Sequence, residues 1–379
     1  MKRTPRHLSR RVPMRFLMAG RKELVHESGE GRQQLLPTLL LLASVFFPCL
    51  VLYQLANPVE YSMVHSAGAG AGGGDVRSEL AVVDVAKLLE IEDYASETEN
   101  VTLERVLEGA AMEDKTILLT TLNEAWAAPN SILDLFLHSF RTGFQTRRLM
   151  DHLVIVALDR QAYKRCLSVH THCFALRTDG VDFSGEKSFM TPDYLKMMWR
   201  RIDFLRSVLE LGYSFVFTDA DVMWFRDPFP VFYPDADFQI ACDHFSGNPT
   251  DLQNRPNGGF NFVKSNNRTV SFYKFWYVSR EAYPGYHDQD VLNFIKYDPF
   301  ITEIGLDMRF LSTEYFGGLC EPSKDFNKVC TMHANCCVGL ARKIHDLNVM
   351  LEDWRRFMSL PPSQKSSSSW GVPSNCSVP

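Results

Sequence analysis

Two carboxylates, Asp219 and Asp221, stand one residue apart at the end of an apolar run that begins at Ser214. The run predicts a buried strand of a mostly parallel sheet, and ligands of open α/β sheets bind just beyond the carboxyl ends of such strands. Carboxylates this close repel each other unless a cation lies between them, and their oxygens suit Mg²⁺ or Mn²⁺. The pair therefore predicts a metal site that can hold a diphosphate. A simpler interpretation is a strand followed by a turn whose Asp residues cap the next helix.

A second polar cluster runs from Asn257 to Phe262 with the sequence NGGFNF. Glycines here let a ligand ring approach the backbone, while Asn257 and Asn261 can exchange hydrogen bonds with hydroxyl groups. As a purely structural feature, Asn-Gly-Gly predicts a tight turn before an apolar strand. The sequence leaves both interpretations open.

Two further clusters lie downstream. The segment His287-Asp288-Gln289-Asp290 precedes an amphipathic helix, so one Asp can cap that helix while the other faces a substrate. His333 lies between Cys330 and Cys336, a spacing that also fits zinc ligands. An oxidising compartment favours disulfides over thiolate ligands there, which leaves His333 free to bind a different metal.

The elements that must position these residues follow a strand-then-helix rhythm. Residues 115–122 and 153–158 read as strands that end in polar residues, and 238–242 as a further strand. Residues 194–211 form the clearest helix, with one apolar stripe and Gly212 as its stop. This helix leads directly into the run that ends at Asp219, which predicts an α/β fold with a mostly parallel central sheet.

The uncharged stretch from Leu35 to Tyr53 predicts a membrane anchor. As a helix it reaches about 28 Å, close to the ~30 Å hydrocarbon core of a bilayer. Basic residues predominate before it, so the positive-inside rule places the N-terminus in the cytosol and the rest of the chain on the other side. The alternative is a cleaved signal peptide, but the stretch is long and starts late. The net charge of −5 gives no general attraction to nucleic acid, which we do not expect as a partner.

Five segments follow from these patterns: a cytosolic basic tail at 1–34, a transmembrane signal anchor at 35–56, a flexible stem at 57–102, a catalytic domain at 103–360 and a disordered Pro/Ser-rich tail at 361–379. Eight of the nine cysteines follow the anchor. We predict one disulfide between Cys166 and Cys173, and a second drawn from Cys320, Cys330, Cys336 and Cys337. Glycosylation sequons at Asn100, Asn267 and Asn375 agree with a lumenal location.

In combination these motifs resemble the plant nucleotide-diphospho-sugar transferases of glycosyltransferase family 77, which have a GT-A fold. The matching segments lie in order between roughly residues 113 and 350: 121–126 (TLNEAW), 217–224 (FTDADVMW), 257–261 (NGGFN), 288–290 (DQD) and 332–337 (MHANCC). The resemblance implies a single Rossmann-like domain in a type II Golgi membrane protein. It also implies transfer of a sugar, with retention, from a UDP-sugar to a cell-wall polysaccharide or glycoprotein.

The resemblance also implies roles for individual residues. Asp219, Asp221 and His333 would hold Mn²⁺ or Mg²⁺ together with the donor diphosphate. Thr121 and Asn123 would line the nucleotide pocket, and Asn257 and Gly258 would face the sugar. Asp290 would lie near the anomeric carbon and support an oxocarbenium-like state, by analogy with glycoside hydrolysis.

Two other functions fit parts of the sequence. Asp219-Ala220-Asp221-Val222 matches the D-x-D-x-[TV] motif of haloacid-dehalogenase-type phosphatases, in which the first Asp attacks phosphorus. The later acidic motifs of those enzymes, G-D-x-x-x-D or a D-D pair, do not follow in this sequence. A non-catalytic carbohydrate-binding relative on the same scaffold is the third possibility. Sugar transfer, phosphate release or neither would distinguish the three.

Overall fold

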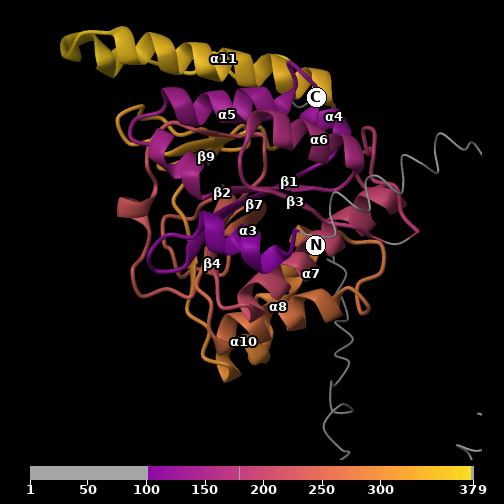
Figure 1. Cartoon of the computed structure of the whole chain (residues 1–379). Coiled ribbons are helices and arrows are strands. Elements are labelled where there is room, and N and C mark those ends of the chain that lie inside the picture. Colours follow the sequence, from indigo (N-terminus) through magenta and orange to yellow (C-terminus); the bar gives the residue numbers. More distant parts are fainter. Residues whose placement is uncertain (1–100, 179, 377–379) are drawn as a thin grey trace, which may run out of the picture. The chain divides into compact units, whose positions relative to one another are not determined.

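A computed structural model of the protein describes residues 101–178 and 180–376 (Figure 1). The predicted basic tail at 1–34, the anchor at 35–56 and all but the last two residues of the stem lie outside these ranges. Helix α3 (Leu103–Ala110) is the first element of the described residues, with Thr102 as its N-cap. Among the described residues, no helix is both long enough and apolar enough to cross a bilayer.

The strands are β1 (Thr116–Leu122), β2 (Leu153–Ala157), β3 (Cys173–Ala175), β4 (Ser214–Thr218), β5 (Val222–Trp224), β6 (Phe238–His244), β7 (Arg255–Val263), β8 (Met308–Phe310), β9 (Phe316–Gly318) and β10 (Thr331–His333). The helices after α3 are α4 (Glu124–Ala127), α5 (Ile132–Thr142), η1 (Arg147–His152), α6 (Arg160–Val169), α7 (Pro192–Glu210), η2 (Phe229–Val231), α8 (Asn267–Ser279), α9 (Asp288–Ile295), α10 (Pro299–Glu303), α11 (Leu340–Ser359) and η3 (Pro362–Ser367).

The central sheet has seven strands in the order β3-β2-β1-β4-β7-β6-β8. The four strands from β3 to β4 run parallel, β7 runs antiparallel to both of its neighbours, and β8 runs parallel to β6. The predicted mostly parallel α/β sheet is therefore confirmed. Strand β4 lies at the middle of the order, so the residues that follow it lie near the centre of one sheet edge.

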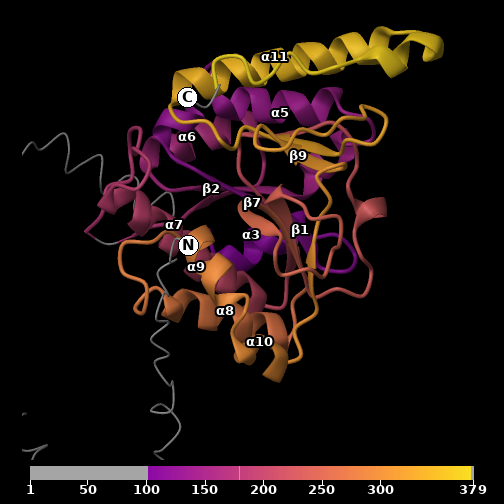
Figure 2. The same ribbon diagram turned by 180° about the vertical axis from the view of Figure 1, so that it is seen from behind.

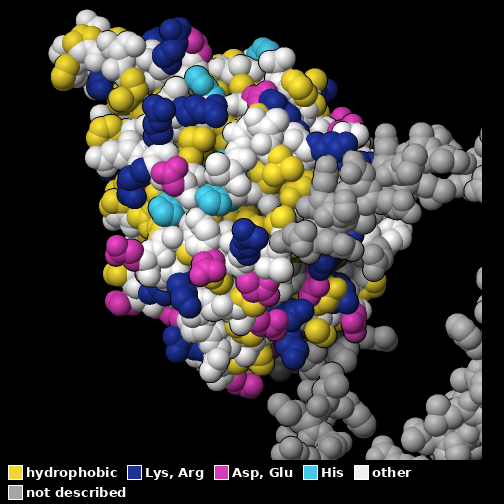
Figure 3. Space-filling model, in the orientation of Figure 1, with side chains coloured by type: hydrophobic (Ala, Val, Ile, Leu, Met, Phe, Trp, Pro, Cys, Tyr) yellow, Lys and Arg dark blue, Asp and Glu magenta, His cyan; other side chains and the backbone are white. Residues whose placement is uncertain are grey.

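Helices cover both faces of this sheet, as Figures 1 and 2 show. Residues of α5, α6 and α11 form one hydrophobic core, and residues of α3, α7, α8 and α9 form the other. Side chains alternate along β4, where Phe215 and Phe217 join the second core and Val216 joins the first. On the face shown in Figure 3, basic and acidic side chains are interspersed.

Helix α7 leads into β4 as the sequence predicted, although it begins two residues earlier. Thr191 caps it through a hydrogen bond from the Tyr194 amide, and Pro192 occupies its first position. Gly212 follows the helix with a φ of +84°, a conformation that glycine adopts without strain. The turn at Gly212 then delivers the chain into β4.

The Asn-Gly-Gly segment is not a tight turn. Residues 257–259 lie inside β7, which pairs with β4 on one side and β6 on the other. The residues that flank this tripeptide pair with β4 and β6, and the register with β6 is irregular between them. The Gly258 and Gly259 amides donate to the side chains of Gln289 and Asn257, so tertiary contacts that local propensity does not contain keep the segment extended.

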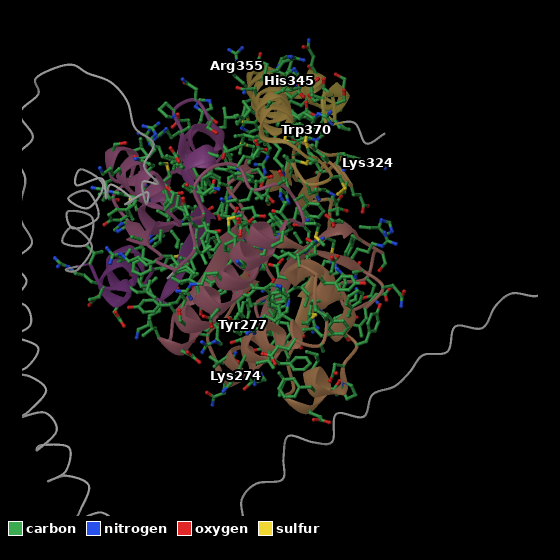
Figure 4. All side chains as sticks on the ribbon, turned by 90° about the vertical axis from the view of Figure 1, so that its right-hand side faces the viewer. Lys274, Tyr277, Lys324, His345, Arg355 and Trp370 are labelled. Atoms are coloured by element: carbon green, nitrogen blue, oxygen red, sulfur yellow. A yellow bond between two sulfur atoms is a disulfide. The ribbon has the colours of Figure 1, made fainter. Side chains whose placement is uncertain are left out.

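The prediction of a disordered C-terminal tail is wrong for residues 361–376. The Trp370 ring stacks on Phe326 at a centroid distance of 3.9 Å and lies beside α11 (Figure 4). The buried Asp346 carboxylate of α11 accepts hydrogen bonds from the amides of residues 374–376. A Pro/Ser-rich composition predicts disorder only when nothing holds the segment, and here an aromatic ring, the Asp346 and Asp353 carboxylates and a disulfide do so.

The predicted disulfide between Cys166 and Cys173 is confirmed. The second predicted bridge is Cys320–Cys336, one of the pairings left open. A third bridge, Cys337–Cys376, joins the loop after β10 to the C-terminal segment and was not predicted. Cys242 and Cys330 are buried free thiols, so Cys330 does not take part in a disulfide.

Candidate metal centre

Three segments far apart in the sequence bring Asp219, Asp221 and His333 together. Asp219 follows the last residue of β4, and its amide donates to the Gly259 carbonyl of β7 at 2.7 Å. Asp221 directly precedes β5, which pairs with β10 so that Val222 lies opposite His333. Pairing on both sides of the turn therefore fixes all three side chains. The turn leads into a strand and not a helix, so the interpretation of these Asp residues as helix caps is wrong.

The three side chains can each offer one ligand atom, and these atoms all lie within 4.8 Å of one another. His333 Nε2 is 3.1 Å from Asp221 Oδ1 and 3.9 Å from Asp219 Oδ2. The 3.1 Å contact lacks hydrogen-bond alignment, and the buried Asp221 Oδ1 accepts no hydrogen bond. The ligand atoms of these three side chains face a common space, which is the arrangement expected for ligands of one cation. Two carboxylates and one imidazole suit Mn²⁺ or Mg²⁺, so the residues fit the implied metal.

Gly259 makes room for this centre. A Cβ atom at Gly259 would lie 2.5 Å from His333 Cε1 and 2.6 Å from Asp219 Oδ2. Both distances are shorter than van der Waals contact allows, so any larger residue would push the β7 backbone away from the metal ligands. The sequence motif singled out Gly258, whereas the close approach to the ligands belongs to its neighbour.

Two cations flank the carboxylates. Lys343 of α11 places its Nζ atom 2.5 Å from Asp221 Oδ2 and donates to the Ala334 carbonyl. Arg201 of α7 lies 2.8 Å from Asp219 Oδ1 and 2.5 Å from Asp288 Oδ2. Because Arg201 and Asp288 are almost completely buried, their charges are compensated mainly by each other and by Asp219.

The surrounding charges and burial shift the pKa values of the two carboxylates in opposite directions. Burial works against the ionised form of Asp221, but Lys343 and His333 outweigh it and hold its pKa well below the usual range. Burial raises the pKa of Asp219, and the charge of Asp221 adds to that rise against the opposing effect of Arg201. Burial disfavours protonated His333, but the two carboxylates prevail and raise its pKa. A divalent cation at the centre would favour the ionised form of both carboxylates.

Asp288, and not Asp290, contacts Arg201 beside this centre. His287 is the N-cap of α9, and Asp288 binds Arg201, which in turn binds Asp219. Burial opposes ionisation of Asp288, but Arg201 and His287 lower its pKa to about 2. The Asp290 carboxylate is 39% exposed and lies 3.4 Å from His287 Nε2. The structure thus pairs Asp290 with His287, and its predicted contact with the sugar stays a prediction.

Asn257 and Gly258 lie beside the centre. The side-chain oxygen Oδ1 of Asn257 accepts from the Gly259 backbone amide at 2.9 Å, and its Nδ2 donates to Asp243 at 2.8 Å. The Gly258 amide donates to Gln289 Oε1 at 3.0 Å. Gly258 also faces Arg201 and Asp288, because a Cβ atom there would lie 3.6 and 3.8 Å from their side chains.

Asn123 and Thr121 lie at the end of β1, next to β4 in the sheet. Asn123 caps α4 through the Trp126 amide and donates to the carbonyls of Phe183 and Gly185 at 3.0 and 2.7 Å. Its hydrogen-bonding groups therefore hold the loop at 183–185. Thr121 is half-buried, and its predicted place in a nucleotide pocket stays a prediction.

Arg201 and Lys343 were missed from the sequence. Both lie on helices, and neither belongs to a recognisable local motif. The available signal was weak: a positive charge within the otherwise apolar stripe of α7 requires a buried partner. Cys330 and its neighbours form no zinc site, because Cys320, Cys336 and Cys337 are in disulfides.

Comparison with known proteins identifies the family. The family model described as nucleotide-diphospho-sugar transferase matches residues 148–347, more than half of the chain and the whole of this centre. The chain belongs to this family. The match confirms the resemblance drawn from the motifs and does not support the haloacid-dehalogenase phosphatase.

Relatives of this transferase occur in Arabidopsis thaliana. An uncharacterized protein is 54% identical over 276 residues, which cover 72% of this chain and 73% of the relative. The UDP-D-xylose:L-fucose alpha-1,3-D-xylosyltransferase MGP4 is 24% identical over 58% of this chain and 67% of its own length. Among solved structures, mouse xyloside xylosyltransferase 1 is 14% identical, with a TM-score of 0.35 over 58% of this chain and 98% of the mouse chain.

Proposed function

We propose that this transferase moves a sugar from a UDP-sugar to a cell-wall polysaccharide or glycoprotein, with retention at the anomeric carbon, and that it requires Mn²⁺ or Mg²⁺. The observation that carries the metal requirement is the convergence of Asp219, Asp221 and His333 with an unpaired buried oxygen on Asp221. Bound there, the ion would stabilise the negative charge that develops on the departing nucleoside diphosphate.

The protein supplies a second positive group on the same side. Lys343 lies four residues into α11, near the positive end of the helix dipole, and its Nζ atom already contacts Asp221. A diphosphate at the centre would compete with Asp221 for this ammonium group. Arg201 instead holds Asp219 in place, since its two terminal nitrogens are taken by Asp219 and Asp288.

The donor sugar would lie beside Asp219 and His333, next to the glycine pair of β7. The two glycines let this strand approach the metal ligands closely, because the space that a Cβ atom would take at each is occupied by neighbouring protein side chains. A UDP-sugar donor and a glycan acceptor are supported by the name of the relative MGP4, a UDP-D-xylose:L-fucose xylosyltransferase. Which sugar this chain transfers is the first question for experiment.

The proposal places the enzyme in the Golgi membrane as a single-pass type II protein with a lumenal catalytic domain. Its support is the apolar stretch at 35–53, the basic residues before it and three disulfides in the described residues. If the domain is lumenal, endoglycosidase treatment of protein from a plant secretory system increases its gel mobility. No mobility shift, together with protease digestion in sealed microsomes, would contradict this topology.

The decisive test is a screen of nucleotide sugars with the purified full-length protein in detergent. We expect one UDP-sugar to be hydrolysed slowly without acceptor, with activity lost in chelator and restored by Mn²⁺. Release of phosphate from simple phosphomonoesters would favour the phosphatase instead. Donor binding without turnover, in the presence of a panel of cell-wall oligosaccharides, would favour the non-catalytic carbohydrate-binding relative.

A further inference from the structure

Asp243, at the end of β6, accepts hydrogen bonds from three neutral amide side chains. Oδ1 accepts from Asn257 Nδ2 and Asn335 Nδ2, each at 2.8 Å, and Oδ2 accepts from Gln289 Nε2 at 2.9 Å. The carboxylate is partly buried, and none of these three donors carries a charge. This differs from Asp219, Asp221 and Asp288, each of which contacts a cationic side chain.

Each of the three amides is fixed at both ends. While its nitrogen donates to Asp243, its oxygen accepts from a backbone N–H: Gly259 for Asn257, Gly258 for Gln289, and Cys320 for Asn335. An amide turned by 180° would place its NH₂ group against a backbone N–H. Since only an acceptor can face three NH₂ groups at once, the carboxylate sets the orientation of all three amides.

These amides come from three elements that build the metal centre. Asn257 lies on β7 beside Gly259, Gln289 follows Asp288 on α9, and Asn335 lies two residues after His333. The fit around Asn335 is close, because a Cβ atom at Gly318 would overlap its side-chain amide. Asp243 therefore links β7, α9 and the loop after β10 at one point.

We propose that Asp243 is a positioning residue that holds the Gly258–Gly259 backbone against Asp219 and His333 by orienting three amides. The expected effect on catalysis rests on the proposed function. Metal binding at Asp219, Asp221 and His333 tests the inference without it. If β7 moves away by a few tenths of an ångström, Asp219 loses the close backbone neighbour that now fixes it.

The test is a swap of donor and acceptor between Asp243 and Asn257. Asp243→Asn can keep its oxygen toward Asn257 and Asn335, and its NH₂ group then faces that of Gln289. Asn257→Asp sets two carboxylates against each other. In the double variant, the new carboxylate at position 257 accepts from the new amide at position 243 and from the Gly259 backbone, and the amide oxygen at position 243 accepts from Gln289. The double variant therefore removes the contact between two carboxylates, while the NH₂ group of Asn335 loses its acceptor.

We expect each single change to lower kcat/KM for transfer about 10- to 100-fold, because each sets like groups against one another inside a partly buried network. The double variant should regain at least about fivefold over Asn257→Asp, since it removes the repulsion between two carboxylates in contact and the effects of the two positions are therefore coupled.

Mn²⁺ affinity, followed by the paramagnetic resonance signal of the free ion, gives a readout that does not require turnover. We expect it to weaken about tenfold in each single variant and to recover in part in the double variant. If the wild type binds Mn²⁺ but transfers no sugar, the proposed function fails while this cycle still tests Asp243. The matched control is Asp251→Asn, on the loop joining β6 and β7. The Asp251 carboxylate accepts from the backbone amide of Gln253. We expect this variant to leave both Mn²⁺ affinity and transfer unchanged.

Three results would overturn the inference: wild-type Mn²⁺ binding and transfer in Asp243→Asn, losses in the double variant that equal the sum of the two singles, or an equal loss in Asp251→Asn. If Asp243→Asn does not fold, Asn335→Ala carries the test, because it removes one arm and leaves the carboxylate in place. We then expect a loss of about three- to tenfold in Mn²⁺ affinity in the folded variant, measured below its melting temperature. Unchanged affinity in Asn335→Ala would equally contradict the role of Asp243.

Discussion

The ends of β4 and β1 lie side by side in the sheet, and both carry polar residues, yet they differ in what those residues contact. Asn123 at the end of β1 uses its side chain to cap α4 and to hold the loop at 183–185. At the end of β4, Asp221 keeps one buried oxygen without a hydrogen bond, next to an imidazole that does not donate to it. The Asn123 side chain is satisfied by its own protein, whereas Asp221 Oδ1 has no aligned hydrogen-bond donor among the described residues.

The difference teaches how to separate structural from functional polar residues at a strand end. Position at the sheet edge is common to both and does not decide the question. Unsatisfied buried acceptors are rare, because leaving them without a partner costs about 1–3 kcal/mol each. The unpaired oxygen of Asp221 lies beside two other potential ligands, and this combination supports the proposed metal site.

The largest effect should come from Asp221→Asn, which removes a charged metal ligand and leaves Lys343 without its carboxylate. We expect kcat/KM for sugar transfer to fall at least about 10²-fold, equivalent to about 3 kcal/mol of transition-state stabilisation. Asp219→Asn should behave similarly. Circular dichroism and melting temperature check that the fold is intact. Wild-type turnover in either variant, or unchanged transfer in chelator, would contradict a role for the metal in the mechanism.

A smaller but clear effect should separate Asp288 from Asp290. Asp288→Asn deprives the buried Arg201 of one carboxylate, and we expect a loss of about 2 kcal/mol in unfolding free energy at pH 7. The pKa of Asp288 is lowered to about 2, below the ~3.9 of an unfolded Asp. Its stabilising contribution is therefore present above about pH 4 and lost as the pH falls toward 2. Denaturant unfolding of the wild type and the variant across this pH range measures their difference in unfolding free energy, which should decrease toward pH 2.

Asp290→Asn is the matched control for Asp288, since its carboxylate is 39% exposed and pairs with His287. We expect little change in unfolding free energy. Its effect on transfer decides the separate prediction that Asp290 supports the anomeric carbon: a loss of about 10²-fold or more in kcat would confirm that prediction, and wild-type kcat would contradict it.

His333→Ala should reduce transfer less than the Asp variants, by about tenfold, because water can replace a neutral imidazole in an octahedral shell more easily than it replaces a carboxylate. Higher Mn²⁺ concentration should recover part of this loss. A titration of activity against Mn²⁺ in the wild type and the variant measures the shift. An effect larger than that of Asp221→Asn would mean that His333 has a role beyond metal binding.

Asn123→Ala should affect stability and leave the metal centre intact. The loss of a helix cap and of two further hydrogen bonds should lower the unfolding free energy by about 1–2 kcal/mol. Mn²⁺ affinity should remain at the wild-type value. If instead the KM for the UDP-sugar rises without a change in stability, the end of β1 also binds the nucleotide. Both strand ends would then have a ligand-binding role.

The sequence alone determined those features that depend on neighbouring residues. Apolar runs and the amphipathic stripe of α7 predicted the parallel strands and the helix before β4, because burial follows the period of the local backbone. The carboxylates after β4 were placed at the sheet edge by the same pattern. A short separation allowed Cys166 and Cys173 to be paired correctly.

Only the tertiary structure decided which polar groups satisfy one another. Arg201, Lys343 and Asp243 lie in no local motif, and their partners come from other helices and strands. Pairing of β7 on either side of Asn257-Gly258-Gly259, with side-chain acceptors for the two glycine amides, made a strand of a segment that could have been a tight turn. One disulfide with Asp346 ordered a tail that composition predicted to be disordered. The physical reason is that hydrogen bonds and ion pairs are completed in space, so the competition for each donor and acceptor is settled by residues that no local sequence window contains.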